Sequence, residues 1–346
     1  MVKYCCTLLV LSLLFISCSE DDDVDSGVKE ERVYVIDNAK FGIKSNKTEA
    51  KATTDGINKA IETAKAEGYN VVKFADGDYL IFCVNDASWY ATDGIFVPTN
   101  MTLDLGNAKF YVEPNTSAHY ALIQIDHVEN VTVRGGQIIG DKTTHIAGHR
   151  AGYGIQVIAS RNVNIENVKI EGVTGDGIIF TCYTYMSFNG RFATKNVKIT
   201  GCDISDCGGR GLHLGHVVDA DVSDNVFHNI KGGSNQYGID TNPNPAWKNV
   251  VENIKIHHNT FRESTGGIRL WGGNDMEVYE NQMENLGIFG LDCQRVKIYK
   301  NNLTEKGSIF VTDGGEDFCI PTEGANKNIC YGVTDNSTKT PNFNCN

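Results

Sequence analysis

Four ionisable side chains recur at one position of a repeated sequence unit. The unit reads Gly, then Ile or Leu, then a variable residue, then in most copies an apolar residue. It begins at Gly154, Gly177, Gly211, Gly238, Gly267 and Gly290. The variable residues, in the same order, are Gln156, Ile179, His213, Asp240, Arg269 and Asp292. Imidazole and carboxyl groups can transfer protons, a guanidinium can bind a carboxylate, and carboxylates can also hold a hard cation.

The repeat predicts that these variable residues share one outward column. Side chains alternate along a strand, so the variable residue points outward where the Ile or Leu before it points inward. Strands of a parallel stack are about 4.8 Å apart, which would set the last four variable residues in a line about 14 Å long. We predict that His213, Asp240, Arg269 and Asp292 are the catalytic residues. A surface ladder of ion pairs would give the same pattern, and this interpretation stays open.

Side chains around the column could bind sugars. Aromatic rings pack on sugar rings, and an arginine can bind the carboxylate of a uronate with two parallel hydrogen bonds. The predicted substrate-binding residues are Gln156, Tyr183, Tyr185, Arg210, His216, Tyr237, Asn242 and Trp271.

Two mechanisms fit the column. In a lyase, Arg269 would neutralise the uronate carboxylate, and His213 or a nearby tyrosine would remove the proton next to it. In an inverting glycoside hydrolase, Asp240 and Asp292 would act two coils apart, about 9.6 Å, near the upper limit for that class. Arg269 between them would lower the carboxyl pKa values, whereas a general acid needs a raised pKa. We favour β-elimination on an acidic polysaccharide, with the hydrolase as the alternative.

A third class is a non-catalytic surface protein, either a glycan binder or a structural solenoid. A binder would use aromatic rings and amides and would not need a column of ionisable groups. The sequence indicates no certain cofactor, although Asp240 and Asp292 could hold a calcium ion. A structural zinc site is not expected, because the sequence has no pair of cysteines at the Cys-x-x-Cys spacing.

A second repeated unit alternates with the first. It begins at Asn162, Asn196, Asp219, Asn253, Asp275 and Arg295, and its apolar residues alternate with polar ones as in strands. An asparagine recurs inside it, at Asn167, Asn225, Asn259, Asn281 and Asn301, where it would suit a left-handed corner. The glycine units start 23 to 34 residues apart with no helix between the strands. This pattern predicts an all-β solenoid of stacked coils.

The segment before the coils has a helical pattern. Residues 54–64 carry apolar residues at helical spacing, with Thr54 or Asp55 as the expected N-cap, and a strand follows from Asn70 to Phe74 with Gly77 and Tyr79 close behind. This helix and strand resemble the start of the pectate-lyase superfamily. The resemblance covers about residues 33–312 and implies a right-handed parallel β-helix with an N-terminal capping helix. The motifs of polygalacturonases, calcium pectate lyases, chondroitinase B and alginate lyases of this fold are not matched.

The first residues resemble a bacterial lipoprotein signal peptide, residues 1–17, with Cys18 as the lipidated residue. An acidic linker would span 18–32, followed by the β-helix domain over 33–346 with an irregular, cysteine-containing cap from about 313. We expect a lipid-anchored outer-membrane protein, facing the cell surface or otherwise the periplasm, and a monomer whose partner is a polysaccharide. The net charge of −12 and the lack of basic blocks argue against a nucleic-acid partner.

Overall fold

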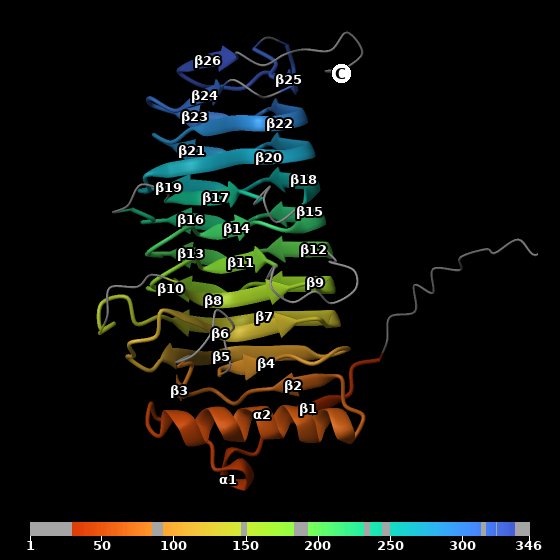
Figure 1. Ribbon diagram of the computed structural model, residues 1–346, viewed down its shortest axis with the longest axis vertical. Helices are drawn as coiled ribbons and strands as arrows, with labels where there is room; N and C mark the ends of the chain where they lie inside the picture. The colour runs from red at the N-terminus through yellow and green to blue at the C-terminus, as the bar shows by residue number, and fades with distance from the viewer. Residues whose placement is uncertain are drawn as a thin grey trace, which may run out of the picture. The chain divides into compact units, whose positions relative to one another are not determined.

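The chain winds into a parallel β-helix capped by a helix at its N-terminal end (Figure 1). The computed structural model describes residues 30–84, 93–146, 151–182, 193–231, 236–243, 250–312, 316–322 and 324–335. Within these ranges every pairing between strands is parallel, and each strand pairs with strands one coil before or after it, which confirms the solenoid that the repeats predict. No helix in the described ranges is long and apolar enough to cross a membrane.

The coils form three faces. Face 1 contains β1 (Val33–Val35), β2 (Val71–Lys73), β5 (Thr102–Val112), β7 (Glu129–Ile139), β9 (Arg161–Glu166), β12 (Thr194–Thr200), β15 (Val217–Ser223), β18 (Val251–His257), β20 (Gly266–Tyr279), β22 (Ile288–Tyr299) and β25 (Glu316–Cys319). Face 2 contains the ends of β5 and β7 with β3 (Asp78–Ile81), β10 (Lys169–Glu171), β13 (Asp203–Ser205), β16 (Val226–His228), β19 (Thr260–Arg262), β21 (Gln282–Glu284) and β23 (Asn302–Thr304).

Face 3 carries the repeated glycine unit. Its strands are β4 (Ile95–Phe96), β6 (His119–Asp126), β8 (Ala151–Ile158), β11 (Ile178–Thr181), β14 (Leu212–Leu214), β17 (Tyr237–Thr241), the first halves of β20 and β22, β24 (Ser308–Val311) and β26 (Gly332–Asp335). The residue after each glycine from Gly154 to Gly267 packs inward, and Ile178, Leu212 and Ile239 are fully buried in register. A slip by one residue would turn this apolar row outward, so burial fixes the register of the variable residues.

The asparagine ladder differs from the sequence prediction. Asn167 does adopt the left-handed conformation, with φ of 55°. At later coils the residue before the asparagine takes that conformation, as at His258 and Glu280. There the asparagine is buried, and its side-chain amide bonds to the next coil, as when Nδ2 of Asn259 donates to Oδ1 of Asn281 at 3.0 Å. An asparagine suits this position of successive coils because its side chain satisfies buried backbone groups of the corner.

The cap is longer than the sequence pattern predicted. Helix α1 covers Asn38–Phe41, and α2 covers Ala50–Ala66 with Glu49 as its N-cap residue, so the expected cap at Thr54 or Asp55 was wrong. Thr54 lies inside α2, where its hydroxyl donates to the Ala50 carbonyl and accepts from the Phe82 amide. At the other end β25 and β26 still pair in parallel with earlier coils, so the sheet continues past residue 313, and Cys319 is disulfide-bonded.

Candidate functional site

The register of face 3 brings His213, Asp240 and Arg269 into one column. Ile179 pairs with His213, His213 with Asp240, and Asp240 with Arg269 on strands β11, β14, β17 and β20. This part of the predicted column is confirmed. On the N-terminal side the column continues through Ile179 to Gln156, Gln124 and Phe96.

Asp292 does not lie in the column. Arg269 pairs with Phe289 of β22, because this coil lies three residues away from the register that the glycine units predict: Leu270, not Gly267, pairs with Gly290. Asp292 lies at an exposed corner with φ of 53°, next to the corner glycine Gly272 of the coil before. The placement of Asp292 beside Arg269 was therefore wrong. The hydrolase alternative loses the pair of carboxylates on which it depended.

A second column, which the sequence analysis missed, lies just before the glycines. Backbone hydrogen bonds set Asp176, Arg210 and Tyr237 on successive coils, each immediately before the glycine of its unit. These side chains reach diagonally to the first column: Asp176 contacts His213, Arg210 contacts Asp240, and Tyr237 contacts Arg269. Reading the residue before each glycine with the same register would have found Asp176. We call Asp176, Arg210, His213, Asp240 and Arg269 the ion cluster.

Asp240 is the centre of the ion cluster. It is fully buried, and its carboxylate accepts three hydrogen bonds from two arginines. Arg269 donates from Nε to Oδ1 at 2.7 Å and from Nη2 to Oδ2 at 2.6 Å, and Arg210 donates from Nε to Oδ2 at 2.7 Å. The charge of Asp240 is thus used to hold two guanidinium groups in place, which makes it a positioning residue and not a general acid.

Asp176 connects Arg210 to His213. Its Oδ1 accepts from the backbone amide of Arg210 at 2.7 Å, and its Oδ2 lies 3.6 Å from Nη1 of Arg210 and 3.4 Å from Nδ1 of His213. Burial would raise the pKa of Asp176, but the contacts with His213 and Arg210 outweigh it and lower that pKa below its ordinary value. Burial opposes the charge on Arg210, yet Asp176 and Asp240 together raise the pKa of this guanidinium. Both groups therefore stay charged.

Neither ring nitrogen of His213 has a hydrogen-bond partner in the described part of the chain, whereas the other four side chains of the ion cluster are hydrogen-bonded. Its side chain is 15% exposed, and Nε2 is enclosed beside Gly215, where an added Cβ would come within 3.2 Å of it. A buried nitrogen without a partner costs about 1–3 kcal/mol. Bonding to a ligand would remove that cost, so Nε2 is the atom of the cluster best suited to take a proton or a hydrogen bond from a substrate.

Aromatic rings flank the cluster. The guanidinium carbon of Arg269 lies 4.6 Å from the centre of the Tyr237 ring and 5.3 Å from that of Trp271. Trp271 is 38% exposed, and its backbone amide bonds to the Thr241 hydroxyl at 3.0 Å. The site therefore combines a fixed cation with an exposed indole face, as binding of a charged sugar requires.

The other predicted binding residues are less well placed. Gln156 and His216 are 2% exposed, and Nδ1 of His216 accepts a hydrogen bond from the Val250 amide at 3.0 Å, so neither presents a free surface to a sugar. Asn242 is half-buried directly after β17. Tyr183, Tyr185 and Cys18 lie outside the described residues.

A calcium ion does not fit the predicted pair. The Asp240 oxygens are occupied by arginine donors, and Asp292 lies at another position of its coil. Cations repel a third cation, so two guanidinium groups exclude Ca²⁺ from this carboxylate. Within the described ranges no group of three or more His, Cys, Asp or Glu side chains is arranged to hold a metal ion.

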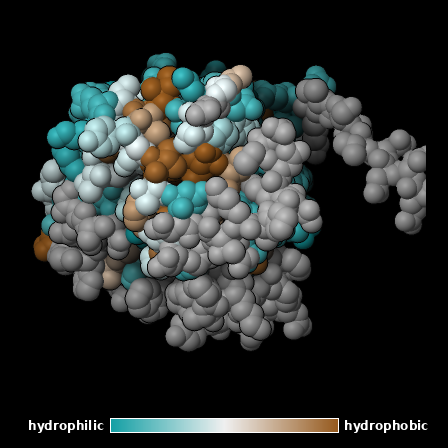
Figure 2. Space-filling model, turned by 90° about the horizontal axis from the view of Figure 1, so that it is seen from above, coloured by the Kyte–Doolittle hydropathy of each residue, from teal (hydrophilic) through white to brown (hydrophobic). Residues whose placement is uncertain are grey.

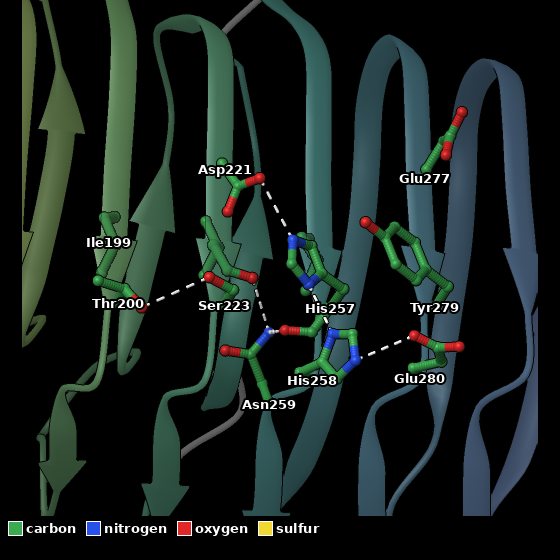
Figure 3. Close-up of polar contacts among 12 residues, drawn as sticks. Ile199, Thr200, Asp221, Ser223, His257, His258, Asn259, Glu277, Tyr279 and Glu280 are labelled. Atoms are coloured by element: carbon green, nitrogen blue, oxygen red, sulfur yellow. Dashed lines mark hydrogen bonds and ion pairs between the residues drawn. The ribbon is translucent and has the colours of Figure 1, made fainter.

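A separate histidine pair lies on face 1 (Figure 3). Nδ1 of His257 is 2.7 Å from Nδ1 of His258, and their Nε2 atoms lie near Asp221 at 3.2 Å and Glu280 at 3.0 Å. Both carboxylates are more than a third exposed, and the His257 ring is stacked on Tyr279. Every ring nitrogen here has a partner, which distinguishes this pair from His213 and favours a surface ladder.

A pocket of about 540 Å³ on face 2, lined by Glu171, Asp206, His228 and Glu263 among others, includes no member of the ion cluster.

Comparisons with known proteins agree with the architecture. The family described as "Right handed beta helix region" matches residues 82–233 and 188–346. Two Bacillus subtilis (strain 168) proteins are similar in sequence: the SPbeta prophage-derived uncharacterized protein YorA, 28% identical over 82% of this chain, and the uncharacterized protein YclG, 33% identical over 49% of it. The chain spans only 50% and 33% of these two relatives.

Solved structures share the fold at low sequence identity. The A-module of the Azotobacter vinelandii mannuronan C-5 epimerase AlgE4 is 14% identical with a TM-score of 0.54, covering 87% of this chain and 96% of that one. A tailspike mutant of E. coli bacteriophage HK620, in complex with a pentasaccharide, is 10% identical with a TM-score of 0.58, covering 86% and 62%. By its coils and by the family match over most of its length, the chain belongs to the right-handed β-helix family.

Proposed function

We propose that the protein is an enzyme that cleaves a uronate-containing polysaccharide by β-elimination at the ion cluster. The observation that carries this proposal is a buried imidazole whose Nε2 has no partner, fixed beside two arginines that are already held by carboxylates. That the fold neighbours include a mannuronan epimerase and a pentasaccharide-bound tailspike supports a glycan as the partner of this face.

The arginines would bind and neutralise the uronate carboxylate. A guanidinium has five N–H donors, and the contacts with Asp176 and Asp240 use Nε and Nη1 of Arg210, which leaves Nη2 for a substrate oxygen. Positive charge at the carboxylate stabilises the negative charge that develops when the neighbouring C–H bond breaks. Asp240 prevents either arginine from turning away, so the donors are aligned before the substrate arrives.

His213 would be the base. Its Nε2 would take the proton from the carbon next to the carboxylate, while Asp176 on the Nδ1 side stabilises the imidazolium that forms. The electron pair of the broken C–H bond becomes the new carbon–carbon double bond. The glycosidic C–O bond on the next carbon breaks, and its oxygen leaves with a proton from water. Tyr237 and Trp271 would pack against the sugar rings.

The test uses the purified protein on a panel of acidic polysaccharides, such as polygalacturonate and alginate. Both the ultraviolet absorbance of an unsaturated uronate and new reducing ends are recorded. We expect both signals, and a loss of at least about 100-fold in His213→Gln. His257→Gln, a histidine outside the ion cluster, is the control and should keep full activity. Reducing ends without absorbance would contradict elimination, and no signal with tight binding would make the protein a glycan binder.

We also propose that Cys18 is lipidated and anchors the protein in the outer membrane, with the acidic run after it favouring the cell surface. The support is the signal-peptide pattern of residues 1–17 alone. Labelled fatty acid should be incorporated into the wild type and not into Cys18→Ala. Labelling of both or of neither would contradict the anchor.

A further inference from the structure

We infer that the polysaccharide lies over the C-terminal coils of face 3 and ends near the ion cluster, so that cleavage takes place close to a chain end. This inference rests on the proposed function and adds the direction and extent of the bound chain. It follows from a difference between the two sides of the cluster along the same column.

On the C-terminal side the column becomes aromatic and open. Arg269 pairs with Phe289, Phe289 with Phe310, and Phe310 with Thr334. The two phenyl rings are stacked with centroids 5.7 Å apart, and Phe310 is 39% exposed. Hydrophobic surface is also gathered in the end-on view of Figure 2, which looks down on the C-terminal coils. The column thus leads from the cluster onto exposed rings.

On the N-terminal side the same column is covered. Ile179, Gln156 and Gln124 are 6%, 2% and 4% exposed. The side-chain Nε2 of Gln124 donates to the backbone carbonyl of Asp93 at 2.7 Å, so the chain at Asp93 and Gly94 lies against this coil. Ile158, in the neighbouring outward position of β8, is also only 5% exposed. A sugar chain would have no open surface to follow in this direction.

The occupant that fits the open side is the continuation of the same substrate. Each uronate presents a C–H face that can pack on an aromatic ring, and Trp271 and Phe289 offer such rings beside Arg269. Exposed apolar residues that stand alone need no explanation. Here Phe310 continues a column that begins at the charged cluster, which favours a binding track.

The experiment compares two phenylalanines at the same column position. Phe96 lies at the N-terminal end of the column and is 41% exposed, almost as Phe310 is at the other end. Each phenylalanine is changed to Ala in a separate variant of the His213→Gln protein, which keeps the polysaccharide intact. Binding of long polygalacturonate and alginate chains to each variant is measured by calorimetry. We expect about tenfold weaker binding for Phe310→Ala, equal to the loss of one aromatic contact, and no change for Phe96→Ala.

Equal affinities of the two variants, or a larger loss for Phe96→Ala, would overturn the track while leaving the proposed function in place. Absence of binding to any acidic polysaccharide in the His213→Gln protein would instead contradict both. Product size gives a second readout in the wild type. Cleavage near an end releases short oligosaccharides from the first minutes, whereas a broad ladder of intermediate sizes would show that the chain extends past the cluster on both sides.

Discussion

Two arginine–aspartate pairs in this protein have almost the same geometry and very different surroundings. Arg269 meets Asp240 through Nε and Nη2 at 2.7 and 2.6 Å, and Arg295 meets Asp275 through the same atoms at 2.7 and 2.7 Å. The side chains of the first pair are 8% and 0% exposed, and both side chains of the second are 41% exposed. The two pairs differ in burial, and Asp240 also accepts a hydrogen bond from Arg210.

The difference indicates why each pair is present. An exposed pair contributes about 0–1 kcal/mol, since water screens it. A buried pair loses the hydration of two ions, and well-packed apolar residues in its place are often as stable or more so. Asp240 and Arg269 are therefore poorly explained by stability. Their presence is explained if the buried Asp240 carboxylate fixes the guanidinium groups of Arg210 and Arg269 in position for a ligand.

The largest effect is expected for Asp240→Asn. This change leaves Arg210 and Arg269 buried without their shared carboxylate, and removal of one partner of a buried pair costs about 3–5 kcal/mol. Urea unfolding followed by circular dichroism would measure the change in the free energy of unfolding. A loss below 1 kcal/mol would mean that water reaches the arginines and that the cluster is not as enclosed as the structure has it.

Asp176→Asn should have a smaller, pH-dependent effect. Because the pKa of Asp176 is lowered in the folded state, its ionised form stabilises the fold at pH values above the unfolded pKa of about 3.9. That contribution is lost as the pH falls through the lower, folded pKa. We expect the wild type to be more stable by about 1–3 kcal/mol at neutral pH, with the difference shrinking below pH about 4. A difference that grows in acid would contradict the direction of the shift.

Asp275→Asn should have the smallest effect. It breaks the same two hydrogen bonds in an exposed position, so we expect a loss of at most about 1 kcal/mol, reduced further by salt. The same urea titration, repeated at low and high ionic strength, makes the comparison direct. A cost equal to that of Asp240→Asn would remove burial as the explanation of the difference between the pairs.

The sequence predicts the coils well because burial repeats in it. Ile178, Leu212 and Ile239 mark the inward row, and the alternation around them places His213 and Asp240 correctly. The predicted position of Asp292 was wrong because the sequence repeat does not show which residues of neighbouring coils pair with each other. Gly290 looks like the start of another unit, but Phe289 takes the column position, and Asp292 is at a corner.

The ion cluster itself was only partly readable from the sequence. Asp176 and Arg210 stand before their glycines, at the turn into the strand, where strand alternation says nothing about direction. Their contacts run diagonally between coils, from Asp176 to His213 and from Arg210 to Asp240. Such contacts depend on the three-dimensional offset of neighbouring corners, which no one-dimensional pattern contains.

The central claim is that the buried pair serves the site and not the stability of the fold. The most direct measurement is made on the double variant Asp240→Leu with Arg269→Met, in which apolar side chains replace both ions. Because the buried Nε of Arg210 also loses its acceptor, we expect the free energy of unfolding to fall by no more than about 1–3 kcal/mol, less than in Asp240→Asn. We also expect loss of the ultraviolet signal from acidic polysaccharide. A folded double variant that still forms the unsaturated product as fast as the wild type would contradict the claim.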